Sequence, residues 1–99
     1  MPNRLEFRPR ARKSLAEIAD HIARDSPRAA IAFVTAVEAR CLALTEFPEQ
    51  GRARDDLAPG LRIMPLDRRT LLAYRINGPV VEIVDVLYGG RDYEALLSE

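Results

Sequence analysis

The sequence is poor in several of the residue types that build catalytic or metal sites. Its 99 residues include one cysteine, one histidine, one lysine and no tryptophan. A single cysteine cannot form an internal disulfide, and this usage is typical of a reducing compartment. One cysteine and one histidine cannot supply the ligand set of a structural zinc site. We therefore expect no disulfide, no bound metal and no cofactor.

Long apolar runs and an excess of charge of one sign are also absent. No stretch approaches the ~18 apolar residues of a membrane span, and the N-terminus lacks the apolar segment of a signal peptide. Fifteen basic and fifteen acidic residues give a formal net charge of zero, whereas nonspecific nucleic-acid binders are usually basic. We expect a cytoplasmic protein without membrane contact and without sequence-specific DNA binding of its own.

The composition, 47% hydrophobic and 30% charged, is typical of a folded globular chain. A chain of this length is expected to form a single domain over residues 1–99. Apolar residues at helical spacing predict one helix over about 10–25 and a second from Ser26-Pro27 to about 45–46. With almost no linker between them, the two helices should fold back on each other as a hairpin.

Alternating apolar and polar residues predict strands on both sides of this hairpin. The expected strands lie around Leu5 and Phe7 and over 61–64, 70–76 and 80–88. A last helical turn is expected over 91–97. Asn77-Gly78 predicts a tight turn between the last two strands. The order β-α-α-β-β-β indicates an α+β domain in which the helical hairpin packs on one face of a small antiparallel sheet.

The second face of this sheet is expected to be partly apolar and too large for so short a chain to cover. The residues available for it are Leu72, Tyr74, Ile76, Val84 and Val86, or their neighbours on the opposite face. An uncovered apolar face of this kind indicates a binding partner.

Three groups of residues could carry chemistry, and each has a simpler structural interpretation. His21 lies off the apolar stripe of the first helix and is expected at the surface. Cys41 lies on the apolar stripe of the second helix and should behave as a small hydrophobic residue. Asp55-Asp56 lies in a loop rich in glycine and proline, as solvated turn residues do, with no third ligand at a characteristic spacing. None of these groups predicts an active site.

Arginine is the one residue type in marked excess, with fourteen arginines to one lysine. Arginine makes planar, bidentate contacts with carboxylates and phosphates and is enriched at interfaces. A solvated face combined with biased codon usage is the alternative interpretation. The candidates for binding a partner are the arginines of the sheet half and two tyrosines of its strands, namely Arg62, Arg68, Arg69, Arg75, Arg91, Tyr74 and Tyr88.

Several segments occur together in an order that is shared with a known family. They are Ala11, Leu15 and Ile18 after an N-terminal strand, Phe47-Pro48-Glu49-Gln50-Gly51-Arg52, Gly60-Leu61-Arg62, Leu72-Ala73-Tyr74-Arg75-Ile76, Val81-Glu82-Ile83-Val84-Asp85-Val86-Leu87-Tyr88 and Gly90-Arg91-Asp92. In these segments the chain resembles the RelE/ParE superfamily of type II toxins, and more closely its ParE branch. The resemblance covers nearly the whole chain.

The resemblance implies a small bacterial toxin that inhibits growth and is neutralised by a cognate antitoxin. The expected antitoxin is ParD-like, a ribbon-helix-helix protein with a C-terminal tail. ParE-like members bind and poison DNA gyrase, whereas RelE-like members cut mRNA in the ribosomal A site. A third alternative is a degenerate member that is not toxic and keeps only antitoxin binding.

The ribonuclease branch uses basic residues and a C-terminal tyrosine, and the sequence matches this set only in part. Arg91 matches the arginine after the last strand, but the arginine expected before the middle strand falls on Leu71 and the tyrosine falls near Leu97. The lysines expected on the first strand of the sheet hairpin are absent. The resemblance therefore favours the gyrase-binding branch without catalysis. The residues left for the ribonuclease alternative are Arg62, Arg69, Arg91 and Tyr93.

Overall fold

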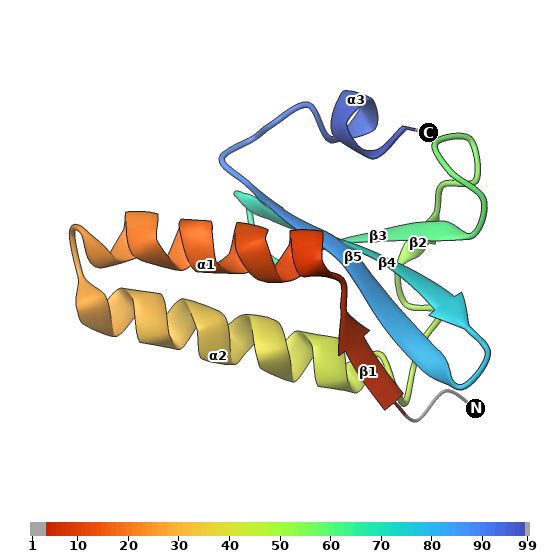
Figure 1. Cartoon of the computed structure of the whole chain (residues 1–99), viewed down its shortest axis with the longest axis horizontal. Helices are drawn as coiled ribbons and strands as arrows, with labels where there is room; N and C mark the ends of the chain where they lie inside the picture. Colours follow the sequence, from red (N-terminus) through yellow and green to blue (C-terminus); the bar gives the residue numbers. More distant parts are fainter. Residues whose placement is uncertain (1–3, 99) are drawn as a thin grey trace.

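The computed structural model describes residues 4–98, which form a helical hairpin packed against a sheet (Figure 1). The elements are β1 (Arg4–Phe7), α1 (Pro9–Ala23), α2 (Pro27–Ala43), β2 (Arg52–Ala53), β3 (Leu61–Pro65), β4 (Thr70–Asn77), β5 (Val80–Tyr88) and α3 (Tyr93–Leu97). The expected order of strands and helices is confirmed, and β2 is an additional short strand in the loop before β3. Neither length nor hydropathy would let any helix between residues 4 and 98 span a bilayer.

The sheet has the strand order β1-β5-β4-β3-β2. β1 pairs in parallel with β5, with Leu5 opposite Val81, and all other neighbouring strands pair antiparallel. The α+β class is confirmed, with the difference that β1 makes the sheet mixed rather than purely antiparallel. The physical reason lies in β5, which is apolar on both faces and is therefore buried between two neighbours.

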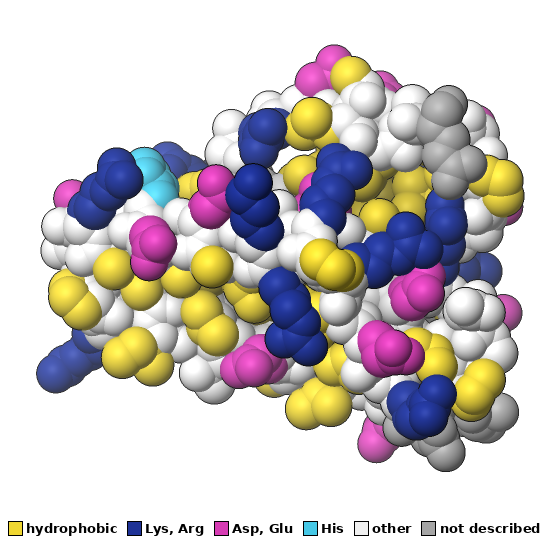
Figure 2. Space-filling model, viewed as in Figure 1, with side chains coloured by type: hydrophobic (Ala, Val, Ile, Leu, Met, Phe, Trp, Pro, Cys, Tyr) yellow, Lys and Arg dark blue, Asp and Glu magenta, His cyan; other side chains and the backbone are white. Residues whose placement is uncertain are grey.

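Ser26 and Pro27 set the boundary between the two helices, as expected from their preference for the start of a helix. The Oγ of Ser26 accepts a hydrogen bond from the N–H of Ala29 at 3.1 Å, and Pro27 opens α2. Because Ser26 is extended, α1 ends at Ala23 rather than at residue 25. Figure 2 shows Lys and Arg side chains along α1 and over the adjoining sheet, and hydrophobic side chains along α2.

The turn between β4 and β5 differs by one residue from the expected position. Asn77 pairs with Val80, so the two-residue loop is Gly78-Pro79 rather than Asn77-Gly78. Gly78 has a φ of 58°, in the left-handed region that favours glycine, whereas proline cannot adopt a positive φ. The hairpin itself is confirmed, and the ring of Pro79 determines which residues turn.

The main core lies between the helical hairpin and one face of the sheet. α1 lies over β5, and α2 runs alongside α1 (Figure 1). The helices and the sheet both contribute fully buried side chains to this core, among them Ala11, Val37, Cys41, Leu44, Leu72, Tyr74, Val81, Ile83 and Val86.

The second face of the sheet is covered, so the expectation of an open apolar face is wrong. The loop between β2 and β3 and the helix α3 bury a second apolar cluster there, consisting of Ala58, Leu61, Ile63, Ala73, Leu87 and Leu97. Of the residues expected on an open face, Leu72, Tyr74 and Val86 lie under the helices, and Val84 packs half-buried on the second cluster. Only Ile76 is exposed, at 38%. The loop and α3 that cover this face are short, and hydrogen bonds from Arg10 and Arg54 hold α3 in place.

Candidate partner-binding site

Five of the candidate side chains meet at one end of the sheet. The antiparallel register places Pro65 opposite Leu71 and Thr70 opposite Tyr88, so the turn after β3 and the chain after β5 reach the same end. This end carries Arg68, Arg69, Tyr88, Arg91 and Tyr93. Sheet register therefore brings together residues that lie up to 25 positions apart in the sequence.

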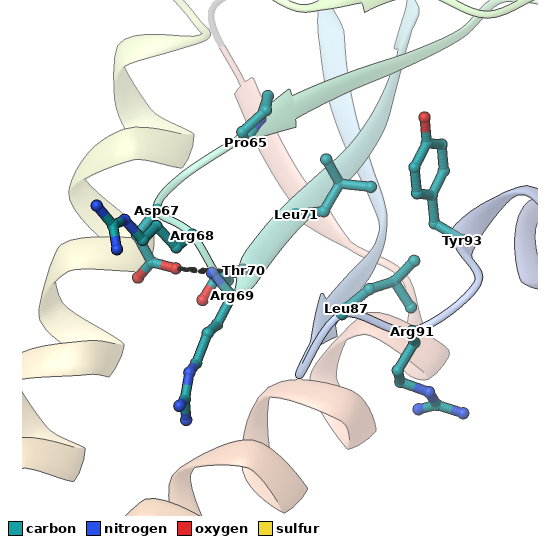
Figure 3. Close-up of a pocket in the computed structure, with 10 residues that line it drawn as sticks. Pro65, Asp67, Arg68, Arg69, Thr70, Leu71, Leu87, Arg91 and Tyr93 are labelled. Carbon is teal, nitrogen blue, oxygen red and sulfur yellow. Dashed lines mark hydrogen bonds between the residues drawn. The ribbon is translucent and has the colours of Figure 1, made fainter.

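A shallow pocket of about 300 Å³ opens at this end of the sheet (Figure 3). Its apolar floor is formed by Leu71 and by Leu87, which is 4% exposed, with Pro65 and Tyr93 beside it. Three exposed arginines surround this floor, and we call them the arginine rim: Arg68, Arg69 and Arg91. Figure 3 shows their guanidinium groups pointing in different directions rather than toward one point.

Asp67 shapes the turn that carries two of the rim arginines. Its Oδ1 accepts hydrogen bonds from the backbone N–H groups of Arg69 and Thr70, both at 2.8 Å. Partial burial opposes ionisation of this carboxyl, but the hydrogen bonds and the charge of Arg69 outweigh it and lower the pKa of Asp67. The carboxylate is thus used to fix the turn.

The chain after β5 places the third rim arginine. The N–H of Gly89 donates to the carbonyl oxygen of Arg69 at 2.9 Å, which ties this segment to the turn after β3. Gly89 and Gly90 have φ values of 82° and 70°, in the left-handed region. Only glycine adopts this conformation without strain, and the resulting turn directs Arg91 back to the pocket.

On the side of the same sheet end that faces the helices, the ring of Tyr88 lies close to the rings of His21 and Phe33. It makes edge contacts with His21 and Phe33, with centroid distances of 6.2 and 6.0 Å. A wide groove of about 560 Å³ runs past it, between α2 and the turn after β3, and is lined by Ile22, Ala29, Ala32, Phe33, Ala36, Asp67, Arg68, Arg69 and Tyr88. Arg68 and Arg69 thus border both the pocket and the groove.

The remaining candidates lie away from the pocket and hold the structure together. Tyr74 is fully buried, and its hydroxyl accepts from the N–H of Gly51 at 2.8 Å and donates to the carbonyl oxygen of Pro48 at 2.6 Å. Arg62 Nη1 donates to the carbonyl oxygen of Gly51 at 2.7 Å. Arg75 is half-buried in β4, opposite Leu61. Tyr74 is therefore inaccessible to a partner, and Arg62 anchors the loop after α2.

Gly51 lies too close to the tyrosine ring to be any other residue. A Cβ at this position would lie 2.6 Å from the Tyr74 Cε1 and Oη atoms, which are immobilised in the core. The segment Phe47 to Arg52 is thus held against one buried aromatic ring through Pro48 and Gly51.

Arg54 stabilises the fold, a role that its place in the sequence does not indicate. Only 8% of it is exposed, and its guanidinium binds both carboxylate oxygens of Asp56 at 2.9 Å, Glu94 at 2.7 Å and the Tyr93 hydroxyl at 3.0 Å. These contacts connect the loop before β3 to α3 and fix the ring that flanks the pocket. The only sequence signal is the spacing Arg54-x-Asp56, which is too common to be informative.

Asp55 and Asp56 are turn residues, as expected. Asp55 Oδ1 accepts a hydrogen bond from the N–H of Gly60 at 2.9 Å, and Asp56 pairs with Arg54. Within residues 4–98 there is no group of three or more His, Cys, Asp or Glu side chains that could hold a metal ion.

The Arg54 network should make the stability of the protein sensitive to acid. Hydrogen bonds from Arg54 lower the pKa of Asp56 in the folded state. A lowered folded-state pKa stabilises the fold above the unfolded value of about 4, and the stabilisation is lost as the pH falls through the folded value. We expect Arg54→Gln to lower the thermal unfolding midpoint at neutral pH, and we expect this difference to shrink below about pH 4.

Circular dichroism melts of the two proteins at neutral and acid pH would measure this effect. Arg28→Gln is the matched control, because Arg28 is exposed on α2 and should show no such difference. A deficit of Arg54→Gln that is the same at both pH values would contradict the assigned role of the ion pair.

His21 and Cys41 occupy the positions expected for them. His21 is exposed on α1, and Cys41 is fully buried in the main core. Burial, with a smaller contribution from Glu38, raises the pKa of Cys41 to about 12. Because the thiolate is the reactive form, the folded protein should not react with iodoacetamide at neutral pH, whereas the urea-unfolded protein should. Mass spectrometry of both samples would measure this, and rapid labelling of the folded protein would show that Cys41 is accessible.

The residues of the ribonuclease alternative are only partly brought together. Arg69, Arg91 and Tyr93 line the pocket, but Arg62 is bonded to the loop after α2 and does not line it. The Tyr93 hydroxyl accepts from Arg54, and Asp67, the only carboxylate among the described residues lining the pocket, is bonded to backbone N–H groups. The arrangement can bind an acidic partner, and both Tyr93 and Asp67, the described lining residues that could accept a proton, are engaged in hydrogen bonds.

Comparison with known proteins identifies a family and a solved structure to which this chain is similar. A family model described as the ParE toxin of the type II toxin–antitoxin system parDE matches residues 5–93. Toxin ParE3 of Caulobacter vibrioides is 41% identical over 56 residues, which are 57% of this chain and about half (55%) of that relative. A solved structure of the chromosomal ParDE system from P. aeruginosa shares the fold, with a TM-score of 0.72 and 24% identity over 86% of this chain and 94% of that chain.

The family match includes every strand except the first residue of β1, both long helices and the whole arginine rim, and it ends at Tyr93. It therefore applies to the elements that build the pocket as well as to those that build the core. The chain belongs to the ParE toxin family of type II toxin–antitoxin systems.

Proposed function

We propose that this chain inhibits DNA gyrase by protein–protein binding and is neutralised by a cognate ParD-like antitoxin, a ribbon-helix-helix protein with a C-terminal tail. The observation that carries the proposal is an arginine rim around an apolar floor, with no evident general base among the lining residues. Such a surface suits binding to a protein and lacks the proton-transfer groups of a nuclease. Membership of the ParE family supports the choice of gyrase and of the antitoxin.

A supercoiling assay with purified gyrase and the full chain tests this proposal. We expect the chain to inhibit supercoiling and to cause cleaved DNA to accumulate, and we expect the antitoxin, added in equal amount, to relieve both effects. A chain in which all three rim arginines are replaced by glutamine should inhibit less, whereas Arg28→Gln should inhibit fully. Normal supercoiling at saturating concentrations of folded chain would refute the gyrase proposal.

The ribonuclease alternative has one observation in its favour, which is that Arg69, Arg91 and Tyr93 line one pocket. Primer extension on mRNA in a translating extract tests it, since A-site cuts should appear with the wild-type chain and disappear with Arg91→Ala. If Arg91→Ala leaves toxicity unchanged, this mechanism is rejected. Normal bacterial growth with abundant soluble chain would instead indicate a non-toxic member that only binds antitoxin.

A further inference from the structure

The pocket at the end of the sheet combines an apolar surface with a positively charged one. Leu71 and Leu87 offer an aliphatic floor, and the arginine rim places three positive charges around it. Its volume of about 300 Å³ is at the lower limit of ~300–1,000 Å³ for small-molecule sites. A space of this size suits a single inserted side chain better than a whole ligand.

We infer that this pocket binds an acidic peptide segment of a partner protein, with one aliphatic side chain on the floor and flanking carboxylates against the arginine rim. The inference rests on the proposed function, because the segment is taken to belong to a protein that the toxin binds. It adds to that function the chemistry by which the partner is recognised.

The rim charges are available for such carboxylates. Arg68, Arg69 and Arg91 are all exposed, and the ion pairs found within residues 4–98 involve Arg8, Arg10 and Arg54 instead. The nearest acid, Asp67, already accepts two backbone hydrogen bonds. Three arginines against one aspartate leave a net positive charge among the described residues that line the pocket, although the chain as a whole has no net charge.

The geometry favours a peptide over a nucleic acid. The rim guanidiniums spread apart (Figure 3), so they match separate anionic groups along a segment better than one phosphate, and the aliphatic floor between them fits an apolar side chain, which a peptide carries and a nucleic-acid backbone lacks. Binding of single-stranded nucleic acid also relies on free aromatic faces for base stacking. Among the described residues that line the pocket, Tyr93 alone has an aromatic ring, and the guanidinium of Arg54 lies 5.7 Å from its centroid.

The groove on the helix side gives the segment a direction in which to continue. Arg68 and Arg69 border the groove as well as the pocket, and Phe33 and Ala32 of α2 supply its apolar wall. A segment that fills the pocket can therefore pass these two arginines and continue along α2. The charged part of the contact then lies between two apolar parts.

Fluorescence anisotropy with the full chain tests this inference. The probe is a labelled synthetic peptide in which one leucine is flanked on each side by two glutamates. We expect Arg68→Gln, Arg69→Gln and Arg91→Gln each to weaken binding roughly two- to fivefold, as for exposed charge pairs, and we expect added salt to weaken it further. Arg28→Gln is the matched control and should bind like the wild type. The same peptide with serine in place of leucine, or with glutamines in place of glutamates, should bind more weakly.

Three results would overturn the inference. They are no binding of the peptide, equal binding by a chain with all three rim arginines replaced, and tighter rim-dependent binding of a single-stranded RNA oligonucleotide than of the peptide. The assay contains no gyrase, so the two proposals fail separately. A chain that inhibits gyrase but does not bind the peptide overturns only this inference, and one that binds the peptide without affecting gyrase supports it and refutes the gyrase target.

Discussion

Replacing Tyr74 by alanine is expected to lower the free energy of unfolding by about 4 kcal/mol, the range for a large aromatic removed from a core. Tyr74 has no exposed surface and belongs to the main core between the sheet and the helices. Domains of this size are stable by roughly 5–15 kcal/mol, so the loss is a large share of the total. Urea denaturation, followed by circular dichroism, would measure it.

Tyr74→Phe separates the hydroxyl from the ring. It keeps the packing and leaves the buried N–H of Gly51 and the carbonyl oxygen of Pro48 without the partner at 2.8 and 2.6 Å. An unsatisfied buried group costs about 1–3 kcal/mol. Tyr88→Phe is the matched control, because Tyr88 is half-exposed and its change should be close to neutral. Equal stabilities of the two phenylalanine variants would show that the hydroxyl of Tyr74 does not hold the loop.

Replacing Arg10 by alanine should have the second-largest effect, about 2 kcal/mol. Arg10 Nε donates to Asp85 at 2.8 Å, and the Asp85 side chain is only 3% exposed. Removing one partner of a buried pair costs about 3–5 kcal/mol, and the expected value is lower here because half of the Arg10 side chain is in water. Within residues 4–98, Asp85 would then keep the hydrogen bond that it accepts from the N–H of Val86.

The chain contains a matched control for this pair. Arg8 and Glu82 are joined at 2.9 Å, but their side chains are 42% and 22% exposed. Arg8→Ala should therefore cost at most about 1 kcal/mol. If urea denaturation gives the same loss for both variants, burial of Asp85 does not determine the strength of its ion pair.

The Arg10 variant should also loosen α3. Arg10 Nη2 donates to the carbonyl oxygen of Leu96 at 3.0 Å, so the same side chain ties α3 to β5. Hydrogen exchange in α3 should accelerate in Arg10→Ala and not in Arg8→Ala. Because Tyr93 of α3 flanks the pocket, the two arginines that fasten α3, Arg10 and Arg54, position the candidate site without belonging to its rim.

Much of the local structure could be predicted because it depends on neighbouring residues. The helical stripes, the cap Ser26 before Pro27 and the apolar alternation of the strands are short-range patterns, and the structure confirms them. The turn at Gly78-Pro79 shows the limit of this reasoning. Both Asn77-Gly78 and Gly78-Pro79 could form the two-residue turn, and the ring of Pro79 determined that the second pair does.

The arginines show what short-range patterns cannot supply. Arg62 and Arg69 look alike in the sequence, yet one bonds the carbonyl oxygen of Gly51 and the other stays exposed at the pocket. Arg54 looked unremarkable, yet it is 8% exposed and bonds Asp56, Glu94 and Tyr93. The role of each depends on partners that the sheet register and α3 bring close, and these partners lie up to forty positions away in the chain.

The sequence by itself determined the α+β class, the hairpin of helices, the position of β5 between two neighbouring strands and the family. Only the tertiary structure decided that β1 joins β5 in parallel, that α3 covers the second face and that three of the arginines surround one pocket. The physical reason is that hydrophobic periodicity specifies which face of an element is buried. It does not specify which distant element that face packs against. The contacts of charged side chains therefore depend on the packing of the whole fold.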